Sequence, residues 1–171
     1  MTASDGRAAI HYTLDGSEPT PASPIYTQPL PLRNRAGVVN GITMIPTNPA
    51  EHRDNLGALT MPPAARELFG WKAPKGEAFK ASVVKGRAFR AGYLPSKTAA
   101  ASYFLDSRGK DRFSLPVISI SLNSDDLFGE ETGIYVPGIQ YLPAAWSFPW
   151  GTGNYFDRRN RMEKNAFLEY F

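Results

Sequence analysis

The chain has 171 residues, of which 42% are hydrophobic and 20% are charged, a balance typical of a globular protein that can bury a core. Its formal charge of +3 is too small to suggest a surface that binds nucleic acid by neutralising phosphates. The chain contains no cysteine, so disulfides, thiolate zinc sites and a thiol nucleophile are excluded. The 15 Gly and 15 Pro residues favour short strands joined by turns over long helices, and no apolar run is long enough to span a membrane. We therefore expect a mostly β fold.

The first predicted element is a strand at 9–14, where apolar residues recur at every second position and would share one face. Asp15 and Gly16 follow it, and both tolerate the backbone angles of a tight turn. Prolines then interrupt the chain, so only short edge segments fit before a longer strand. These segments are predicted at 25–26 and 30–32, and the longer strand at 38–45.

Periodicity fails over 46–76, where a single small helix at 64–69 fits the residue types. Regular alternation returns over 79–90, which predicts a long strand with a bulge or bend at Gly86. A turn then leads into a strand at 99–105, and the two strands are expected to pair.

Beyond a polar linker at 106–112, alternation over 115–122 predicts another strand. A helical turn follows at 125–128, with Asn123 or Ser124 as its cap. The remaining elements are a brief strand at 134–136, an aromatic loop rich in Pro and Gly at 138–155, and a last strand at 166–171.

Four stretches in the first part of the chain carry a family resemblance: 10–20, 23–26, 84–89 and 92–96. The first contains the string Tyr-Thr-Leu-Asp-Gly-Ser-Glu-Pro-Thr, which places a strand, a tight turn and a proline stop in fixed order. Together they resemble the domain at the C-terminus of chitobiases and β-hexosaminidases. The resemblance implies an Ig-like β-sandwich over 1–105 that lacks its first strands, with 106–112 as a linker.

Four later stretches, 114–120, 125–128, 131–138 and 153–156, resemble the opening of the CotH kinase family, which is named for a spore-coat protein kinase. The resemblance implies that residues 113–171 begin an α+β kinase-like domain. In that family the nucleotide-binding and catalytic residues lie downstream of this opening, so no catalytic residue and no metal ligand is carried over. ATP and a divalent metal are implied only for the complete parent protein, and no cofactor is expected in this chain.

The order of the two modules is typical of large bacterial surface or secreted proteins. We therefore expect an extracellular or cell-surface location and a chain cut at both ends. The expected function is that of a non-catalytic accessory fragment, whose sandwich orients the adjacent kinase-like domain or contacts polysaccharide. The alternative is a part of an ATP-dependent, CotH-like protein kinase whose catalytic residues lie beyond residue 171.

The best candidates for ligand binding are aromatic residues of the predicted loop at 138–155. Flat apolar rings in an irregular segment can stack on sugar faces or on a partner, but they can equally be buried between domains. The rings are Tyr141, Trp146, Phe148, Trp150 and Tyr155, and the site assignment rests on Tyr141, Trp146, Trp150 and Tyr155.

Polar residues are less favoured as metal ligands or catalytic groups. His11 and His52 have no neighbouring ligand-like residue and are expected to be solvated. An acidic group could hold calcium, although capping of a helix explains its first two members more simply. The group consists of Asp125, Asp126, Glu130 and Glu131.

Two further patterns suggest kinase chemistry only superficially. Residues 151–154 form a Gly-x-Gly turn that lacks the Lys and Ser/Thr of a phosphate loop. Lys85 follows two valines, as a kinase strand lysine does, but it belongs to the sandwich resemblance and no catalytic-loop motif follows it. Neither pattern predicts a catalytic site.

Overall fold

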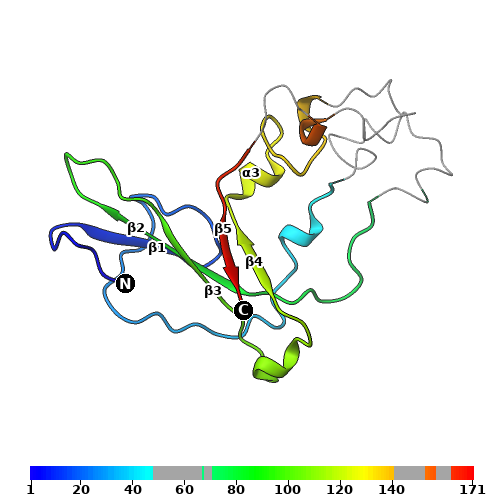
Figure 1. Ribbon diagram of the computed structural model, residues 1–171, viewed down its shortest axis with the longest axis horizontal. Coiled ribbons are helices and arrows are strands. Elements are labelled where there is room, and N and C mark those ends of the chain that lie inside the picture. The colour runs from blue at the N-terminus through cyan, green and yellow to red at the C-terminus, as the bar shows by residue number, and fades with distance from the viewer. Residues whose placement is uncertain (48–66, 68–70, 141–152, 157–162) are drawn as a thin grey trace. The chain divides into compact units, whose positions relative to one another are not determined.

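The computed structural model describes residues 1–47, 67, 71–140, 153–156 and 163–171 (Figure 1). Among these residues the fold is mostly β, with five strands in two antiparallel sheets and one five-residue α-helix, which confirms the fold class expected from composition. The chain divides into two compact units. The first comprises Met1–Val38, Phe79–Asn123 and Ala166–Phe171, and the second comprises Val39–Ala78 and Ser124–Asn165. The domain boundaries expected from sequence stay a prediction.

The first sheet has the strand order β1-β2-β3, formed by Ala9–Thr13, Ser82–Phe89 and Ala99–Tyr103. The predicted pairing of the second and third strands is confirmed. The predicted bulge at Gly86 is wrong, because Gly86 pairs in register with Tyr12 on one side and with Ala99 on the other. The absent side chain instead leaves room for Met1, whose Sδ would lie 2.7 Å from an added Cβ.

The predicted turn after β1 is confirmed. Gly16 has a φ of +84°, a conformation that L residues with a side chain rarely adopt. Asp15 stabilises the turn, because its Oδ1 accepts hydrogen bonds from the hydroxyl of Ser17 at 2.6 Å and from its backbone N–H at 3.0 Å. The Ser17 hydroxyl is the main cause that lowers the pKa of Asp15 from its usual value.

The predicted edge segment at 25–26 is present only as an isolated bridge between Ile25 and His11. The segment at 30–32 is not a strand. The predicted strand at 38–45 is wrong, since the only regular element there is the 3-10 helix η1, Ile42–Met44. Val39 is 86% exposed, so this apolar run does not bury a strand face, and apolar composition alone misled the prediction.

The second sheet pairs β4, Ile118–Ser121, with β5, Phe167–Tyr170, as two antiparallel strands (Figure 1). Both strands lie inside the ranges predicted from sequence. Immediately beyond them, Val117 and Phe171 exchange both backbone hydrogen bonds, at 3.0 and 2.9 Å. The predicted linker contains a 3-10 helix, η2, at Gly109–Arg112.

In the second unit the predicted helical turn is confirmed as α3, Ser124–Phe128. The predicted strand at 134–136 is wrong, because the backbone N–H groups of Ile134 and Tyr135 bond back to the carbonyls of Asp126 and Leu127. Carbonyls at the end of a helix lack partners within the helix, and this segment supplies them. Two further 3-10 helices follow, η3 at Gly138–Gln140 and η5 at Asn154–Phe156. The predicted helix at 64–69 lies outside the described residues apart from Glu67, which is helical.

Candidate interaction surface

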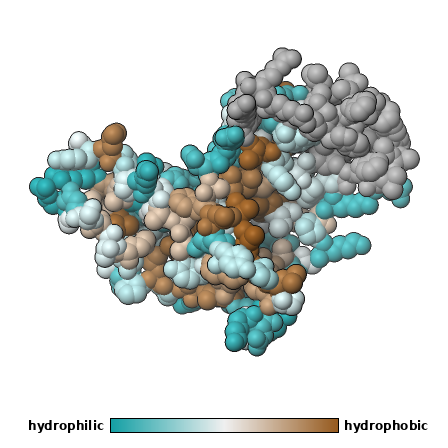
Figure 2. Space-filling view, in the orientation of Figure 1, coloured by the Kyte–Doolittle hydropathy of each residue, from teal (hydrophilic) through white to brown (hydrophobic). Residues whose placement is uncertain are grey.

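The β4–β5 ribbon presents an apolar face to solvent, which we call the outer face. The register pairs Ile118 with Tyr170 and Ile120 with Leu168. Because Val117 and Phe171 form a hydrogen-bonded pair, these two pairs are of the non-hydrogen-bonded kind, whose side chains lie closest together. Ile118 and Ile120 are 61% and 63% exposed, and Leu168 and Tyr170 are 71% and 72% exposed. Figure 2 shows apolar surface gathered over β4 and β5.

The opposite, inner face of the ribbon carries its serines and its one glutamate. Within the paired strands it carries Ser119, Ser121 and Glu169 together with Phe167, and the apolar pair Val117 and Phe171 extends this face just beyond them. The hydroxyl of Ser119 lies 2.7 Å from that of Ser102 on β3, and Ser121 is buried. Oε2 of Glu169 is buried and has no hydrogen-bond partner among the described residues. The ribbon therefore has the reverse of the usual polarity, with serines inside and isoleucines outside.

This arrangement is unfavourable for the described chain in isolation. Burying an Ile or Leu side chain contributes roughly 1.5–3 kcal/mol, and this gain is forgone at each exposed position of the outer face. Two strands alone also make a marginal sheet in water. Exposed apolar patches of this kind mark interaction sites, so we assign the outer face as the candidate interaction surface. Sequence reasoning missed it, because alternation shows which residues share a face but not which face meets solvent.

An aromatic cluster lies at the end of the ribbon where Phe171 follows β5. Phe104 contacts Phe171 edge to face, with the ring centroids 5.0 Å apart, and Phe113 packs against both Phe104 and Phe79. The guanidinium of Arg112 lies 3.8 Å from the centroid of Phe79. The cavity beside this cluster has a volume of about 640 Å³, which is within the size range of ligand pockets. Its lining includes Tyr103, Phe104, Phe113, Leu115, Val117 and Phe171.

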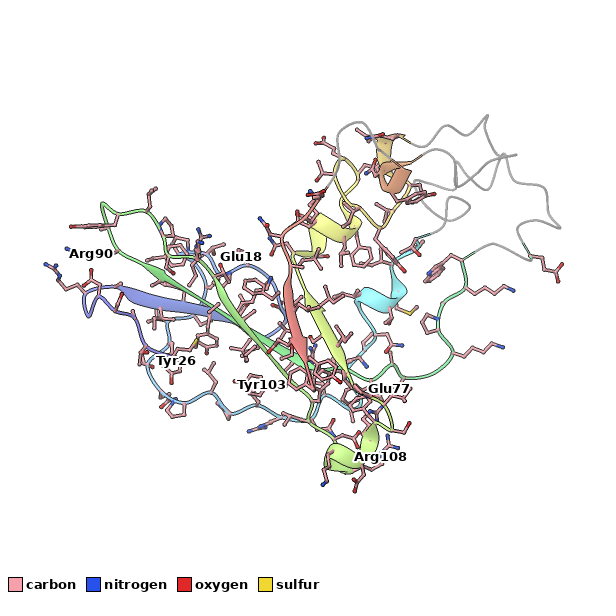
Figure 3. The ribbon with its side chains drawn as sticks, in the orientation of Figure 1. Glu18, Tyr26, Glu77, Arg90, Tyr103 and Arg108 are labelled. Carbon is pink, nitrogen blue, oxygen red and sulfur yellow. The ribbon has the colours of Figure 1, made fainter. Side chains whose placement is uncertain are left out.

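Asp106 holds the η2 turn beside this cluster, where Arg108 also lies (Figure 3). Its Oδ1 accepts a hydrogen bond from the backbone N–H of Arg108 at 2.9 Å, and its Oδ2 accepts one from Nη1 of Arg112 at 2.8 Å. The Arg108 backbone N–H is the main cause that lowers the pKa of Asp106, with further lowering by the side chains of Arg108 and Arg112. The carboxylate therefore fixes the guanidinium that stacks on Phe79.

A second polar group surrounds Glu18, which follows the turn after β1. Oε1 of Glu18 accepts a hydrogen bond from the hydroxyl of Thr98 and lies 3.5 Å from Nη1 of Arg87. Oε2 lies 3.9 Å from Nζ of Lys85, whose side chain is fully buried. Sequence reasoning gave Lys85 no role, and its burial could not be predicted from the alternation of β2.

The aromatic residues expected to bind a ligand cannot be placed together. Tyr141, Trp146, Phe148 and Trp150 lie outside the described residues, and Tyr155 is half-buried in η5.

The expectation for His11 was wrong. Its side chain is buried, with Nδ1 2.7 Å from the carbonyl oxygen of Ser23 and the ring edge-on to Phe89. The bridge between His11 and Ile25 brings the segment of Ser23 alongside β1. His52 lies outside the described residues.

Of the acidic group, Asp125 and Asp126 lie in the first turn of α3, and Asp126 pairs with Lys164 at 3.2 Å. No cluster of three or more His, Cys, Asp or Glu side chains suited to a metal ion occurs among the described residues. Residues 151–152 of the Gly-x-Gly turn are outside those residues, whereas Asn154 is buried and its Nδ2 donates to the carbonyl of Glu130 at 2.9 Å.

Residues 1–103, which contain β1, β2 and β3, match the family model described as Fn3 associated. The chain belongs to the Fn3 associated family. The Fn3 associated region thus ends with β3, and the β4–β5 ribbon follows it in sequence. No curated protein and no solved structure matches the chain significantly. None of the described helices is long and apolar enough to span a membrane.

Proposed function

We propose that this chain is a non-catalytic accessory module of a bacterial extracellular protein, and that its outer face docks onto a neighbouring kinase-like domain. In this proposal the Fn3 associated region is an Ig-like sandwich of the chitobiase type, which orients the ribbon. The β4–β5 ribbon then serves as the attachment point.

The observation that carries the proposal is the reversed polarity of the ribbon. The outer face exposes four apolar side chains to solvent, those of Ile118, Ile120, Leu168 and Tyr170. On the inner face, the hydroxyl of Ser119 is hydrogen-bonded to that of Ser102. A ribbon that buries its serines and exposes its isoleucines gains most from a partner that covers the outer face. The occupant we favour is kinase-like because β4 and α3 lie in two of the stretches that resemble the CotH kinase family, 114–120 and 125–128.

The rival function is phosphotransfer by the parent protein, with ATP and a divalent metal. In the favoured proposal this chain contributes only scaffold, so incubation of the purified chain with labelled ATP and Mg²⁺ or Mn²⁺ is expected to give no transfer to itself or to a general acceptor protein. Transfer of label by the chain alone would establish the rival.

Contact with polysaccharide is a further proposal for the aromatic residues Trp146 and Trp150. It predicts retention on chitin or on a glycan array that is lost in Trp146→Ala and Trp150→Ala. Retention that does not depend on these rings would contradict the proposal that the two tryptophans bind polysaccharide.

Docking is tested by site-specific photo-crosslinking in the producing cell. A photoreactive phenylalanine analogue is placed at Ile120 on the outer face, and the matched control carries it at Leu94, which is 95% exposed in the turn between β2 and β3. We expect crosslinks from Ile120, but not from Leu94, to peptides of a domain that carries CotH kinase motifs. Crosslinks from Ile120 only to polysaccharide or to second copies of this chain, or no crosslinks, would contradict the proposal.

A further inference from the structure

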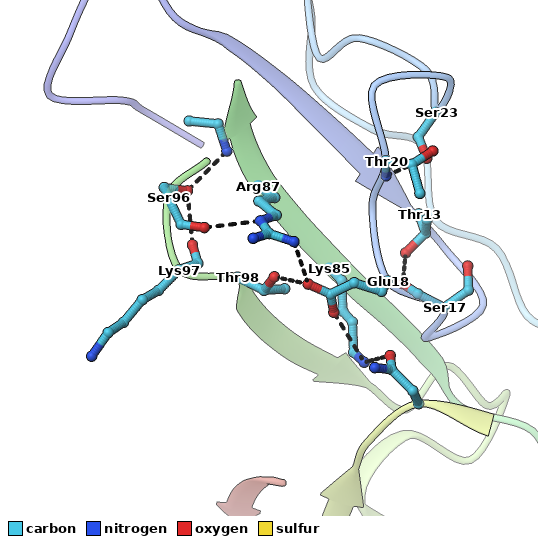
Figure 4. Close-up of polar contacts among 12 residues, drawn as sticks. Thr13, Ser17, Glu18, Thr20, Ser23, Lys85, Arg87, Ser96, Lys97 and Thr98 are labelled. Carbon is cyan, nitrogen blue, oxygen red and sulfur yellow. Dashed lines mark hydrogen bonds and ion pairs between the residues drawn. The ribbon is translucent and has the colours of Figure 1, made fainter. Parts of the chain in front are cut away.

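Lys85 is enclosed by three groups that together resemble a reaction site more than an ion pair. Its side chain is fully buried in the middle of β2. Its Nζ lies 3.9 Å from Oε2 of Glu18 (Figure 4). It also lies 3.4 Å from Oδ1 of Asn123 and 5.6 Å from the ring centroid of Phe167. A buried primary amine therefore lies beside a carboxamide and a carboxylate, with an aromatic wall.

The two oxygens of Glu18 have separate roles in this arrangement. Oε1 is held by the hydroxyl of Thr98 and by Arg87 (Figure 4). These contacts fix the carboxylate plane and leave Oε2 directed at Nζ of Lys85. Glu18 is half-buried, so a proton that it receives can pass on to solvent.

We propose that Lys85 and Asn123 form an intramolecular amide bond, with Glu18 as the proton acceptor. Oε2 of Glu18 takes a proton from the Lys85 ammonium, which leaves a neutral amine with a lone pair. The amine attacks Cγ of Asn123, and the C–N bond to the carboxamide nitrogen then breaks. Glu18 passes this first proton to that nitrogen, which leaves as ammonia, and then accepts the second proton of the attacking nitrogen, so that a neutral amide remains. Glu18 ends the step protonated and releases this proton to solvent, so atoms and charge balance and no other reactant is required.

Proximity and exclusion of water favour this step. The hydrogen bond of 3.4 Å from Nζ to Oδ1 holds the amine beside the Asn123 carboxamide, whose Cγ is the atom to be attacked. Well-oriented intramolecular partners reach effective concentrations of roughly 10⁵–10⁸ M, which offsets the low reactivity of a carboxamide. The bond also removes a buried ammonium, whose desolvation is costly. This inference does not depend on the proposed docking function.

The test is the intact mass of the purified chain after prolonged incubation at neutral pH. We expect a mass lower than that of the sequence by about 17 Da, the mass of the ammonia that leaves as the amide forms. Proteolysis should then yield one branched peptide that joins the segment of Lys85 to the segment of Asn123. A mass equal to that of the sequence overturns the proposal.

Variants separate this bond from a succinimide at Asn123, which also loses ammonia. Lys85→Arg keeps the charge but should show no loss of mass, so a loss that persists in Lys85→Arg overturns the proposal. Glu18→Gln preserves the shape of the side chain and should slow the reaction by about 100-fold or more, since general bases contribute at least that factor. Formation at the normal rate in Glu18→Gln, with native circular dichroism, also overturns it.

Discussion

Ile120 of β4 lies directly opposite Leu168 of β5, and the two side chains are 63% and 71% exposed. On the other face of the same ribbon, the hydroxyl of the neighbouring Ser119 is hydrogen-bonded to that of Ser102. The ribbon thus exposes to solvent the apolar side chains that a sheet usually buries in a core. The apolar pair is the centre of the surface that we assign to a protein partner.

Replacing this pair should reduce exposed apolar surface with little loss of stability. The double variant Ile120→Ser/Leu168→Ser is expected to lower the fluorescence of a bound hydrophobic dye several-fold. The free energy of unfolding should change by less than about 1 kcal/mol per site, because exposed positions contribute little burial. Val39→Ser, which removes one exposed side chain from the other unit, is the control and should leave most of the dye signal. An unchanged signal in the double variant would mean that the outer face is not the dye site.

The hydroxyl contact between Ser102 and Ser119 should couple the ribbon to the first sheet. A double-mutant cycle with Ser102→Ala and Ser119→Ala is expected to give a coupling free energy of about 0.5–1.5 kcal/mol, the usual net value of a hydrogen bond. Urea denaturation of the four proteins measures it. Additive effects of the two substitutions would show that the inner faces do not pack as described.

Asp106 should contribute stability that depends on pH. Its pKa is below the ordinary value of 3.8, chiefly because of the backbone N–H of Arg108. A carboxyl whose pKa is lower in the folded state stabilises the fold at pH values above its unfolded pKa, and this contribution is lost as pH falls through the folded pKa. Asp106→Asn should therefore be less stable than the parent at pH 7, and the difference should shrink between about pH 4 and pH 2.

The measurement for Asp106 is urea denaturation at several pH values. Asp5 and Asp15, whose pKa values are also lowered, are present in both proteins, so their contributions cancel in the comparison. Asp111→Asn, in the η2 helix and exposed, is the matched control. A difference between parent and Asp106→Asn that stays constant down to pH 2 would disprove the role of the carboxylate.

The turn after β1 should tolerate only glycine at position 16. Gly16→Ala forces a side chain into the left-handed region at φ +84°, which costs roughly 1–2 kcal/mol. Gly6→Ala is the control, since Gly6 has no positive φ and an added Cβ there meets nothing within 4 Å. Equal unfolding midpoints for the two variants would argue against the described turn.

Sequence reasoning located the strands well where local chemistry decides them. The Asp15-Gly16 turn and the pairing of β2 with β3 both follow from residue types within a few positions. It failed at 38–45 and 134–136, because there the outcome depends on distant partners. Val39 pairs with no strand among the described residues and is exposed. The backbone N–H of Ile134 donates to the carbonyl of Asp126 near the end of α3.

The candidate surface was beyond the reach of sequence for a similar reason. Alternation over β4 separates Ile118 and Ile120 from Ser119 and Ser121. The usual pattern of a half-buried strand would predict that the isoleucine face is the buried one. Only the register with β5 and the contact with Ser102 show that the serines are inside.

Hydroxyl-radical footprinting of the outer face, in the isolated chain and in the native protein from the producing cell, tests the docking surface most directly. We predict strong labelling of four side chains in the isolated chain and several-fold protection of all four in the native protein. They are Ile118, Ile120, Leu168 and Tyr170. Leu94, which is 95% exposed, should be labelled equally in both. Equal labelling of the four side chains in the two samples would contradict the assignment of this face as a docking surface.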